Sequence, residues 1–471
     1  MEIPLFLYML TSYLKYPVFQ NLMYEKSCLV RYSEVRIFSK CSNVTAYYND
    51  KSIQADANHF YFLSSVVLTL PSFFSTLLLG AATDLWSVKV PLLIPFFGLI
   101  LCTSNYVMQT VYMDASIYLL LISDAIFGIC GGYIAILATV ISYGVKTTSV
   151  PRRSVRIAGV EGAIGLGGTA GYILSGTTRE ILGYPYVFLL MLILQVVAFF
   201  YILIFAKECK RTGIDRQDNE VLILERTSKL FWKCVEALSN YRQLLTISRR
   251  FQFILGLNLL AFGVELFIFS GLMDIQYSYL QFKLGWGDQQ YGWFSGLTVY
   301  FANWQTLISV LYPLLYLRGF TDGTLGCFGL LAKMLSLVLL AFLTNSAMAY
   351  SLIVVTCLNR FIPTGFRSFI SSIIETTEQG KMFSLIALLE GAIGLLASAF
   401  FNTLYPKTLS FFPGLFYIAS CLVLGLVAAQ IAVVADFAVA FARKKVSSLV
   451  DLDQLAYSFQ MGQNDCEETL N

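Results

Sequence analysis

Twelve long apolar segments constrain this chain more than any other feature of its sequence. A helix that crosses a bilayer needs about 20 apolar residues, and each segment comes close to that length. Of the 471 residues, 57% are hydrophobic and 13% are charged, whereas a soluble protein has nearer a quarter charged. We therefore predict an all-α membrane protein. The expected spans are 3–23, 60–80, 92–111, 117–142, 157–177, 186–206, 251–273, 292–317, 324–344, 349–366, 382–401 and 412–440.

Two hydrophilic stretches separate these segments. Residues 24–59 lie between the first and second, and residues 207–250 divide the twelve into two sets of six. Two six-helix halves joined by a central polar loop are typical of the major facilitator fold, in which the halves are pseudo-symmetric. The expected units are an N-terminal half at 1–206 with an outside loop at 24–59, a cytosolic linker at 207–250, a C-terminal half at 251–442 and a cytosolic tail at 443–471.

A repeated pentapeptide supports the duplication. The residues Glu161–Gly165 read EGAIG, and the same five letters recur at Glu390–Gly394. A basic residue lies nine positions before each Glu, Arg152 in one copy and Lys381 in the other. An ionised carboxylate in apolar surroundings is costly, so such a Glu is a candidate functional residue. The alternative is a chance similarity between two helices rich in Gly and Ala.

The distribution of Lys and Arg predicts the orientation. With the N-terminus in the cytosol, the cytosolic loops and tail hold most of these residues, so both termini are expected to be cytosolic. The sequon Asn43-Val44-Thr45 then falls in the first outside loop, where Asn43 can be glycosylated. Cys28 and Cys41 lie in the same loop, and a local disulfide is consistent with that oxidising compartment.

Other function classes find little support. The single histidine, His59, and ten cysteines without CxxC pairs predict no metal site and no cofactor. Nothing resembles a nucleophile with its base, so we do not expect an enzyme. We expect no nucleic-acid partner; the expected partners are a small-molecule substrate, protons and the lipid bilayer.

The segment from Gly80 to Lys89 resembles the GxxxDxxGR[RK] gating loop of the same superfamily. Gly80 would permit a tight helix end, and Asp84 could cap a helix of the other half or pair with an Arg. The match is partial, because Ser87 stands where Gly is expected and Val88 where a basic residue is. The alternative for Asp84 is a solvated loop charge.

Motifs in the C-terminal half resemble the proton-coupled folate transporter family (solute carrier family 46). Its members carry the pattern TEQG…FS…FNxLYPxTL. The matching residues are Thr377–Gly380, Phe383-Ser384 and Phe401–Leu409. The N-terminal stretch up to Cys28 and the segment Gly80–Leu93 fit the same family.

This resemblance implies proton-driven transport of an organic anion with a large ring system. It implies proton coupling by Glu161, which matches the family's Glu in helix five. It also matches Arg367 to the family's Arg near the inner end of helix ten, and Asp84 to the Asp of the gating loop.

The chain departs from the family at three positions. The family's helix-seven His is missing from Leu260–Gly263, and Ile129-Cys130 replaces the Asp before the Gly-Gly of helix four. Gly285 stands where the family has the second Cys of an outside disulfide. Folate itself is therefore in question, and Glu265 becomes the best candidate to replace the missing His in proton coupling.

Charged residues within the expected helices must pair, titrate or face water. Seven residues fall in this class: Lys15, Asp124, Glu161, Glu265, Lys333, Arg360 and Glu390. For Glu161, a structural ion pair with Arg152 is the alternative to proton coupling. For Glu390 we favour a structural role.

Three basic residues are candidates for binding an anionic substrate. Arg360 and Arg367 are seven residues apart, which places them on one face of a helix. Their planar guanidinium groups suit a carboxylate or phosphate. The alternative is that they extend to the cytosolic headgroups. Lys15, in the first expected span, is a further possible contact for an anion.

The sequence predicts proton-coupled symport of an organic anion or of a folate-like or amphipathic metabolite. The mechanism would be alternating access, by rocking of the halves. Two alternatives remain open: a lysosomal or vesicular metabolite exporter of the same fold, and a membrane receptor that does not transport. The host would be the plasma membrane or an endolysosomal membrane.

Overall fold

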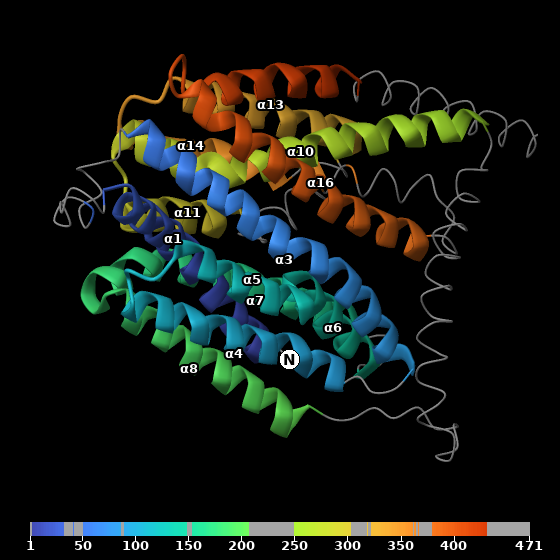
Figure 1. Ribbon diagram of the computed structural model, residues 1–471. Coiled ribbons are helices and arrows are strands. Elements are labelled where there is room, and N and C mark those ends of the chain that lie inside the picture. Colours follow the sequence, from blue (N-terminus) through green and yellow to red (C-terminus); the bar gives the residue numbers. More distant parts are fainter. Residues whose placement is uncertain are drawn as a thin grey trace, which may run out of the picture.

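The protein is a bundle of long helices (Figure 1). A computed structural model describes residues 2–32, 41, 50–85, 89–147, 153–206, 249–302, 318, 322–360, 362–363, 366 and 379–430. When α5 and α6 are counted as one interrupted helix, these residues contribute to twelve helices, six on each side of the central segment. The predicted fold class is confirmed at this level.

The N-terminal half contains the helices drawn in blue to green (Figure 1). They are α1 (Glu2–Tyr32), α3 (Lys51–Leu85), α4 (Lys89–Val111), α5 (Leu120–Ile129), α6 (Gly132–Thr147), α7 (Arg153–Leu182) and α8 (Tyr184–Phe205). They enclose one hydrophobic core, with Tyr8, Phe96 and Phe188 among its fully buried side chains. Gly183 has a φ of +79°, and this left-handed conformation allows α8 to begin two residues after α7 ends.

The C-terminal half contains the helices drawn in yellow to red. They are α10 (Arg249–Leu284), α11 (Asp288–Ala302), α13 (Asp322–Ala341), α14 (Ser346–Thr356), α16 (Gln379–Thr408) and a last helix over Leu415–Gln430. Their core also includes Tyr24, Ile53 and Tyr172 from α1, α3 and α7. The two halves therefore share a packed core where those three helices meet α10 and α11.

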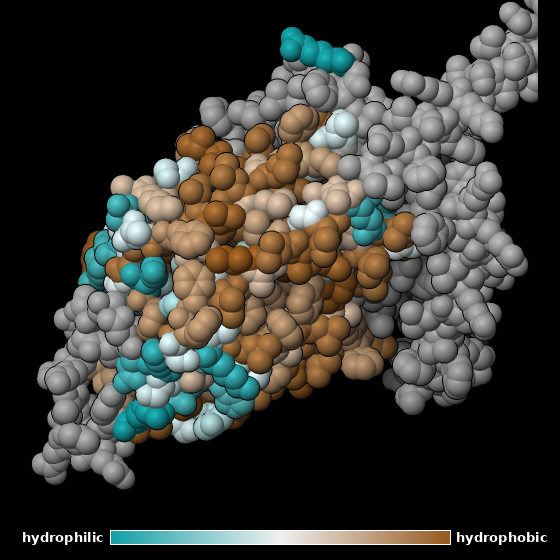
Figure 2. Space-filling model, turned by 90° about the horizontal axis from the view of Figure 1, so that it is seen from above, coloured by the Kyte–Doolittle hydropathy of each residue, from teal (hydrophilic) through white to brown (hydrophobic). Residues whose placement is uncertain are grey.

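The outer surface is suited to lipid. Five helical segments of the described chain are long and apolar enough to cross a membrane. Along α8, the side chains of Leu189, Ile193, Val197, Phe200 and Ile204 are 40–70% exposed and follow helical spacing. Figure 2 shows a broad hydrophobic area on one face of the molecule. A large exposed apolar surface of this kind indicates contact with a membrane.

The helices around the first polar loop are longer than predicted. The helices extend beyond the predicted spans into the expected loop 24–59, because α1 continues to Tyr32 and α3 begins at Lys51. Asp50 caps α3, since its Oδ1 accepts the backbone N–H groups of Ser52 at 2.9 Å and Ile53 at 3.4 Å. The prediction followed apolar residues alone, and a helix can extend into water with polar residues.

The fourth predicted span, 117–142, is interrupted. After α5 ends, Gly131 and Gly132 take φ angles of +105° and +58°, and α6 begins. Two hydroxyl groups of α3 bind carbonyls at the break, Ser75 Oγ to Ile129 O at 2.6 Å and Thr76 Oγ1 to Gly131 O at 3.3 Å. Donors from α3 thus satisfy two carbonyl groups at the break.

Candidate functional site

A charged network lies inside the N-terminal half. Asp124 of α5 is 1% exposed and accepts hydrogen bonds from Ser64 Oγ at 2.6 Å and Tyr106 Oη at 2.7 Å. Lys15 Nζ of α1 donates to the same Tyr106 Oη at 2.8 Å and lies 3.9 Å from Asp124 Oδ1. Tyr106 therefore links a cation to a buried carboxylate. Four helices contribute one residue each: α1, α3, α4 and α5.

Lys15 remains partly accessible within this network. Its side chain is 24% exposed, and Nζ lies 4.7 Å from the ring centroid of Phe19 and 4.5 Å from that of Tyr106. Aromatic faces attract a cation without neutralising its charge. Lys15 therefore keeps its charge and part of its surface, while its predicted role in binding an anion stays a prediction.

A second ion pair lies inside the C-terminal half. Glu265 Oε1 of α10 accepts from Lys333 Nζ of α13 at 2.5 Å, and their side chains are 6% and 7% exposed. Each charge compensates the other, which a buried ion requires. The expectation that helix charges must pair is met here, while a role of Glu265 in proton coupling stays a prediction.

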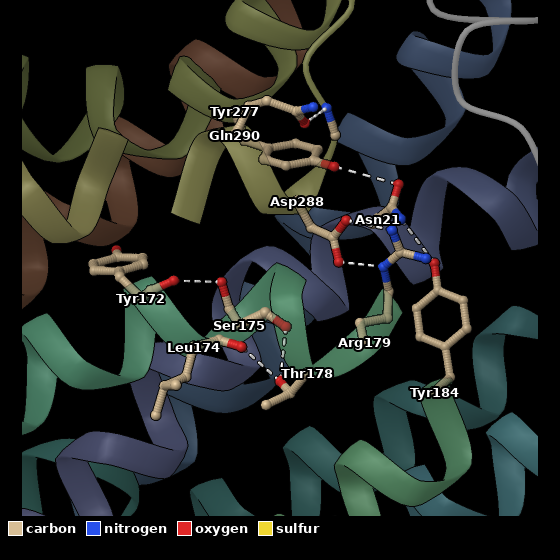
Figure 3. A network of polar contacts seen from close by, with 11 residues as sticks. Asn21, Tyr172, Leu174, Ser175, Thr178, Arg179, Tyr184, Tyr277, Asp288 and Gln290 are labelled. Atoms are coloured by element: carbon tan, nitrogen blue, oxygen red, sulfur yellow. Dashed lines mark hydrogen bonds and ion pairs between the residues drawn. The ribbon is translucent and has the colours of Figure 1, made fainter. Parts of the chain in front are cut away.

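The two halves are joined at the end of the bundle that holds the Cys28–Cys41 disulfide, which we call the disulfide end. There, Arg179 of α7 forms a bidentate ion pair with Asp288 of α11, with Nη2 2.7 Å from Oδ1 (Figure 3). The Asp288 side chain is fully buried. The Arg179 guanidinium also lies 5.6 Å from the ring centroid of Tyr184.

Amide and hydroxyl groups extend this junction. Asn21 Nδ2 of α1 donates to Tyr184 Oη at 2.9 Å, and its Oδ1 accepts from Tyr277 Oη of α10 at 3.3 Å (Figure 3). Tyr24 Oη of α1 donates to Ser278 Oγ of α10 at 2.6 Å. These bonds connect helices of both halves, so the disulfide end is closed.

Glycines allow the backbones of α7 and α11 to touch. A Cβ on Gly176 would lie 2.0 Å from Gln289 Cα, and one on Gly292 would lie 2.5 Å from Tyr172 O. Neither space can hold a methyl group. The closed end therefore depends on shape complementarity between α7 and α11 as well as on the Arg179 ion pair.

Gly176→Ala is expected to prevent full closure of the disulfide end, because the new methyl group would overlap the α11 backbone. Gly162→Ala is the matched control on the same helix, since a Cβ there meets nothing within 4 Å. Cross-linking between cysteines placed at 180 and 290 would measure closure. We expect at least about a tenfold slower reaction for Gly176→Ala, corresponding to about 1.4 kcal/mol. Equal rates for both variants would contradict this.

A further carboxylate lies near Arg179. Burial raises the pKa of Glu25, and the hydrogen bond with Tyr184 and the charge of Arg179 lower it by less. The disulfide end therefore contains the buried Arg179–Asp288 pair and a second carboxylate that takes up a proton more readily than an exposed Glu.

The two copies of the EGAIG repeat differ in their surroundings. A Cβ on Gly162 would meet nothing within 4 Å, whereas one on Gly391 would lie 2.4 Å from Phe73 Cζ of α3. Glu161 lies in α7, and its side chain is outside the described part of the structure. Glu390 lies in α16 and is half-buried.

The gating-loop prediction needs a correction. Gly80 does not end a helix, because α3 continues through Asp84 to Leu85. The side chain of Asp84 lies outside the described residues. Lys89 begins α4, and its Nζ donates to Leu203 O at 2.5 Å, near the end of α8. Lys89 thus lies beside the C-terminus of α8. A Lys in that position commonly donates to the last carbonyl groups of the helix.

Five further predicted residues are the two loop cysteines, the two arginines in or just after the tenth expected span and the glycosylation candidate. Cys28 and Cys41 form a disulfide with Cα atoms 5.7 Å apart. Arg360 ends a 3₁₀ turn over Cys357–Arg360, not an α-helix, so its α-helical register with Arg367 is not continuous at that point. Arg367 and Asn43 lie outside the described residues.

Sequence reasoning missed the partners at the junction. Arg179 and Asp288 lie between the expected spans, at 178–185 and 274–291, and no motif connects them. Asp124 was noted as a helix charge, but its link to Lys15 was not foreseen. The only signal in the sequence for the pair of Lys15 and Asp124 was that each is a charge of opposite sign within an expected helix.

Comparisons with known proteins give the family. A model described as Major Facilitator Superfamily matches residues 6–399. The human lysosomal proton-coupled steroid conjugate and bile acid symporter SLC46A3 is 26% identical, over 84% of this chain and 86% of the relative. The rat proton-coupled folate transporter is 25% identical, over 84% and 83%. Mouse solute carrier family 46 member 2 is also 25% identical, over 84% of each. The predicted resemblance to solute carrier family 46 is confirmed.

Solved structures agree on the fold. The human organic anion transporter MFSD10 (TETRAN) aligns over 91% of this chain and 97% of its own, with a TM-score of 0.59 and 15% identity. A POT family transporter in complex with 5-aminolevulinic acid aligns over 92% and 95%, with a TM-score of 0.59 and 12% identity. At these identities the likeness concerns the fold alone.

Proposed function

This chain belongs to the Major Facilitator Superfamily, and from that premise we propose that it is a proton-coupled symporter of an organic anion. It is a multi-pass membrane transporter similar to members of solute carrier family 46, and not an enzyme. The substrate class follows from a basic residue, Lys15, that is partly accessible. The names of two relatives, which refer to steroid conjugates, bile acids and folate, are consistent with a bulky organic anion.

One observation carries the proposal: Lys15 and the buried Asp124 share Tyr106. While Asp124 is ionised, its charge compensates Lys15. When Asp124 takes up a proton, the ammonium group loses its counter-ion and attracts an anion. Proton and anion therefore favour each other's binding, which is the coupling that symport requires.

The other residues predicted from the sequence are proposed to act in the same transport cycle. Protonation of Glu265 would break its pair with Lys333 and allow α10 and α13 to move apart. Glu161 is a further proposed proton-coupling residue, by its match to the family. Arg360 and Arg367 are proposed as additional contacts for the anion. Gly80, Asp84 and Lys89 are proposed to act at the gate opposite the disulfide end.

We assign the orientation from charge. Both termini are proposed to be cytosolic, with the disulfide end and a glycosylated Asn43 on the other side. In that orientation the contacts at Arg179 close the transporter toward the outside or the lumen. The host is proposed to be the plasma membrane or an endolysosomal membrane.

A lysosomal exporter is the second candidate, because SLC46A3 is named a lysosomal symporter. The chemistry would be the same, since an acidic lumen supplies protons on the disulfide side. The two candidates differ only in which membrane holds the protein, and localisation in cells distinguishes them.

Uptake into proteoliposomes with an imposed pH gradient tests the proposal. A panel of a folate, a bile acid and a steroid sulfate would be offered at pH 5.5 outside and 7.5 inside. We expect gradient-dependent uptake of at least one compound by the unmodified protein. Lys15→Met should reduce it by about tenfold or more, the loss of a charge-assisted contact of about 1.5–3 kcal/mol. Lys15→Arg, which keeps the charge, should retain most of it.

The double variant Lys15→Met/Asp124→Asn separates binding from folding. It removes both charges, so no ion is left unpaired, and it should fold as well as the parent protein. It should still fail to take up the anion. Undiminished uptake by this variant would exclude Lys15 as the anion site, and no gradient-dependent uptake by the parent would exclude the proposed function.

A further inference from the structure

Asp274 is a carboxylate of α10 that the proposed transport cycle does not use. It is half-buried, and its Oδ2 accepts from Asn402 Nδ2 of α16 at 3.1 Å. Asn402 is 1% exposed and also donates to Ser398 O at 3.0 Å. Within the described part of the chain, no Lys or Arg lies within ion-pair distance of Asp274. Its neighbours there are neutral, unlike those of Asp124 and Glu265.

The position of Asp274 ties it to closure. The α10 segment Met273–Ser278 makes several contacts with the N-terminal half. Met273 O accepts from Tyr16 Oη at 3.0 Å. Ser278 O accepts from Gln54 Nε2 at 3.2 Å, while Ser278 Oγ donates to Asn58 Oδ1 at 3.0 Å. Asp274 lies within this segment and joins it to α16.

Among the described residues, the titratable groups that Asp274 acts on are phenols. Its carboxylate acts electrostatically on Tyr16 of α1, Tyr61 of α3 and Tyr291 of α11. Tyrosines, with ordinary pKa values near 10, stay neutral between pH 5 and 8. Other charged groups at the same end include the Arg179–Asp288 pair, Glu25, the buried Lys26 and the exposed Arg31–Asp56 pair.

We propose that Asp274 is a proton-binding site that controls closure of the disulfide end. An ionised carboxylate among neutral groups is costly when α1 and α3 pack against α10. If the helices separate, more water reaches the half-buried carboxylate and the cost falls. A proton therefore binds more tightly in the closed arrangement, and by linkage proton binding favours closure.

The sign of the pH dependence follows from this linkage. Because the closed state holds the proton more tightly, closure is favoured at low pH and is lost as the pH rises. A proton taken up at the open disulfide end would then be enclosed with the substrate. This role rests on the proposed proton-coupled cycle and extends it, since Asp274 would act on the gate and Asp124 on the anion.

A buried reporter can measure closure without any substrate. Ser175 of α7 is fully buried beside Gly292, so Ser175→Cys reacts with a maleimide only when α7 and α11 separate. Ser116 is exposed, and Ser116→Cys corrects for the pH dependence of thiol reactivity itself. Labelling of the unmodified protein gives the background from its own cysteines. The full chain would be studied in lipid nanodiscs between pH 5.5 and 8.

With Asp274 present, the corrected Ser175→Cys rate is expected to rise with pH by about 5- to 150-fold, the usual range of coupling between two sites. Asp274→Asn, which mimics the protonated acid, should hold the rate low at every pH. Asp274→Glu should keep the pH response. A pH response in Asp274→Asn equal to that of the parent, or none in the parent, would overturn the proposal.

Proteoliposome uptake separates the two proposals. If the parent shows no gradient-dependent uptake of any compound, the proposed function fails whatever the reporter shows. If the parent shows such uptake and Asp274→Asn keeps both the uptake and the pH response of the reporter, only the role of Asp274 fails.

Discussion

Arg179→Ala is expected to leave the disulfide end mostly open. The substitution leaves Asp288 fully buried without its cation, and breaking a buried pair in this way costs about 3–5 kcal/mol. At 1.4 kcal/mol per factor of ten, the ratio of closed to open molecules would fall by about 100-fold or more. Spin labels at positions 180 and 290, both exposed, would report a longer distance between α7 and α11, and uptake would fall by more than about tenfold.

The exchange Arg179→Asp/Asp288→Arg is the control for charge. It restores opposite charges across the same two helices and should recover part of the closed population, which neither single change does. A distance distribution in Arg179→Ala that matches the parent would show that the glycine contacts alone hold this end closed. Equal loss in the exchange and in the single variants would point to the Tyr184 and Asn21 contacts instead.

Glu265→Ala is expected to destabilise the C-terminal half strongly. It leaves the Lys333 ammonium buried without a counter-ion, again at about 3–5 kcal/mol. Its thermal unfolding midpoint in detergent should fall clearly below that of the parent. Glu390→Ala, at a half-buried position of α16, is the comparison and should cost less.

The double variant Glu265→Leu/Lys333→Met tests whether the pair has a role beyond stability. Replacing a buried ion pair with apolar residues of similar volume is often neutral or stabilising. We expect near-parental unfolding but loss of the uptake that depends on the pH gradient. If the double variant kept that uptake, Glu265 would be structural only.

Most of the fold was predictable because a bilayer leaves few choices. A run of about 20 apolar residues in lipid must be a helix, and the polar segment at 207–250 divides the helices evenly. The ends of the helices were not predictable in the same way. Polar residues extend α1 to Tyr32, and the Asp50 cap sets the start of α3, so the apolar pattern gives the span and not the helix.

Single residues of the site could be predicted from the sequence, but the contacts between them could not. Lys15 and Glu265 were identified because a charge inside an apolar helix needs an explanation. Their pairings were not, since Lys15 lies 91 residues from Tyr106 and Glu265 lies 68 residues from Lys333. Arg179 and Asp288, 109 residues apart, fall near helix ends where charges are ordinary. Only packing of the two halves reveals that they meet.

The EGAIG repeat also shows that the sequence does not reveal which residues meet in the fold. Identical letters at Glu161 and Glu390 indicate a duplicated architecture, but the helices around the two copies differ. Gly391 packs against Phe73, and Gly162 has open space beside it. Sequence symmetry therefore predicts the shared fold of the halves and cannot predict which copy has a chemical role.

The interruption of the helix at Gly131 and Gly132 limits how this gene can vary. Both residues have positive φ angles. A Cβ would lie 2.5 Å from Ala135 Cβ at Gly131 and 2.3 Å from Ser72 Oγ at Gly132. Any missense change at either codon adds a Cβ to strained backbone and occupied space. Alleles with such changes would behave as loss of the protein from the membrane, not as altered substrate preference.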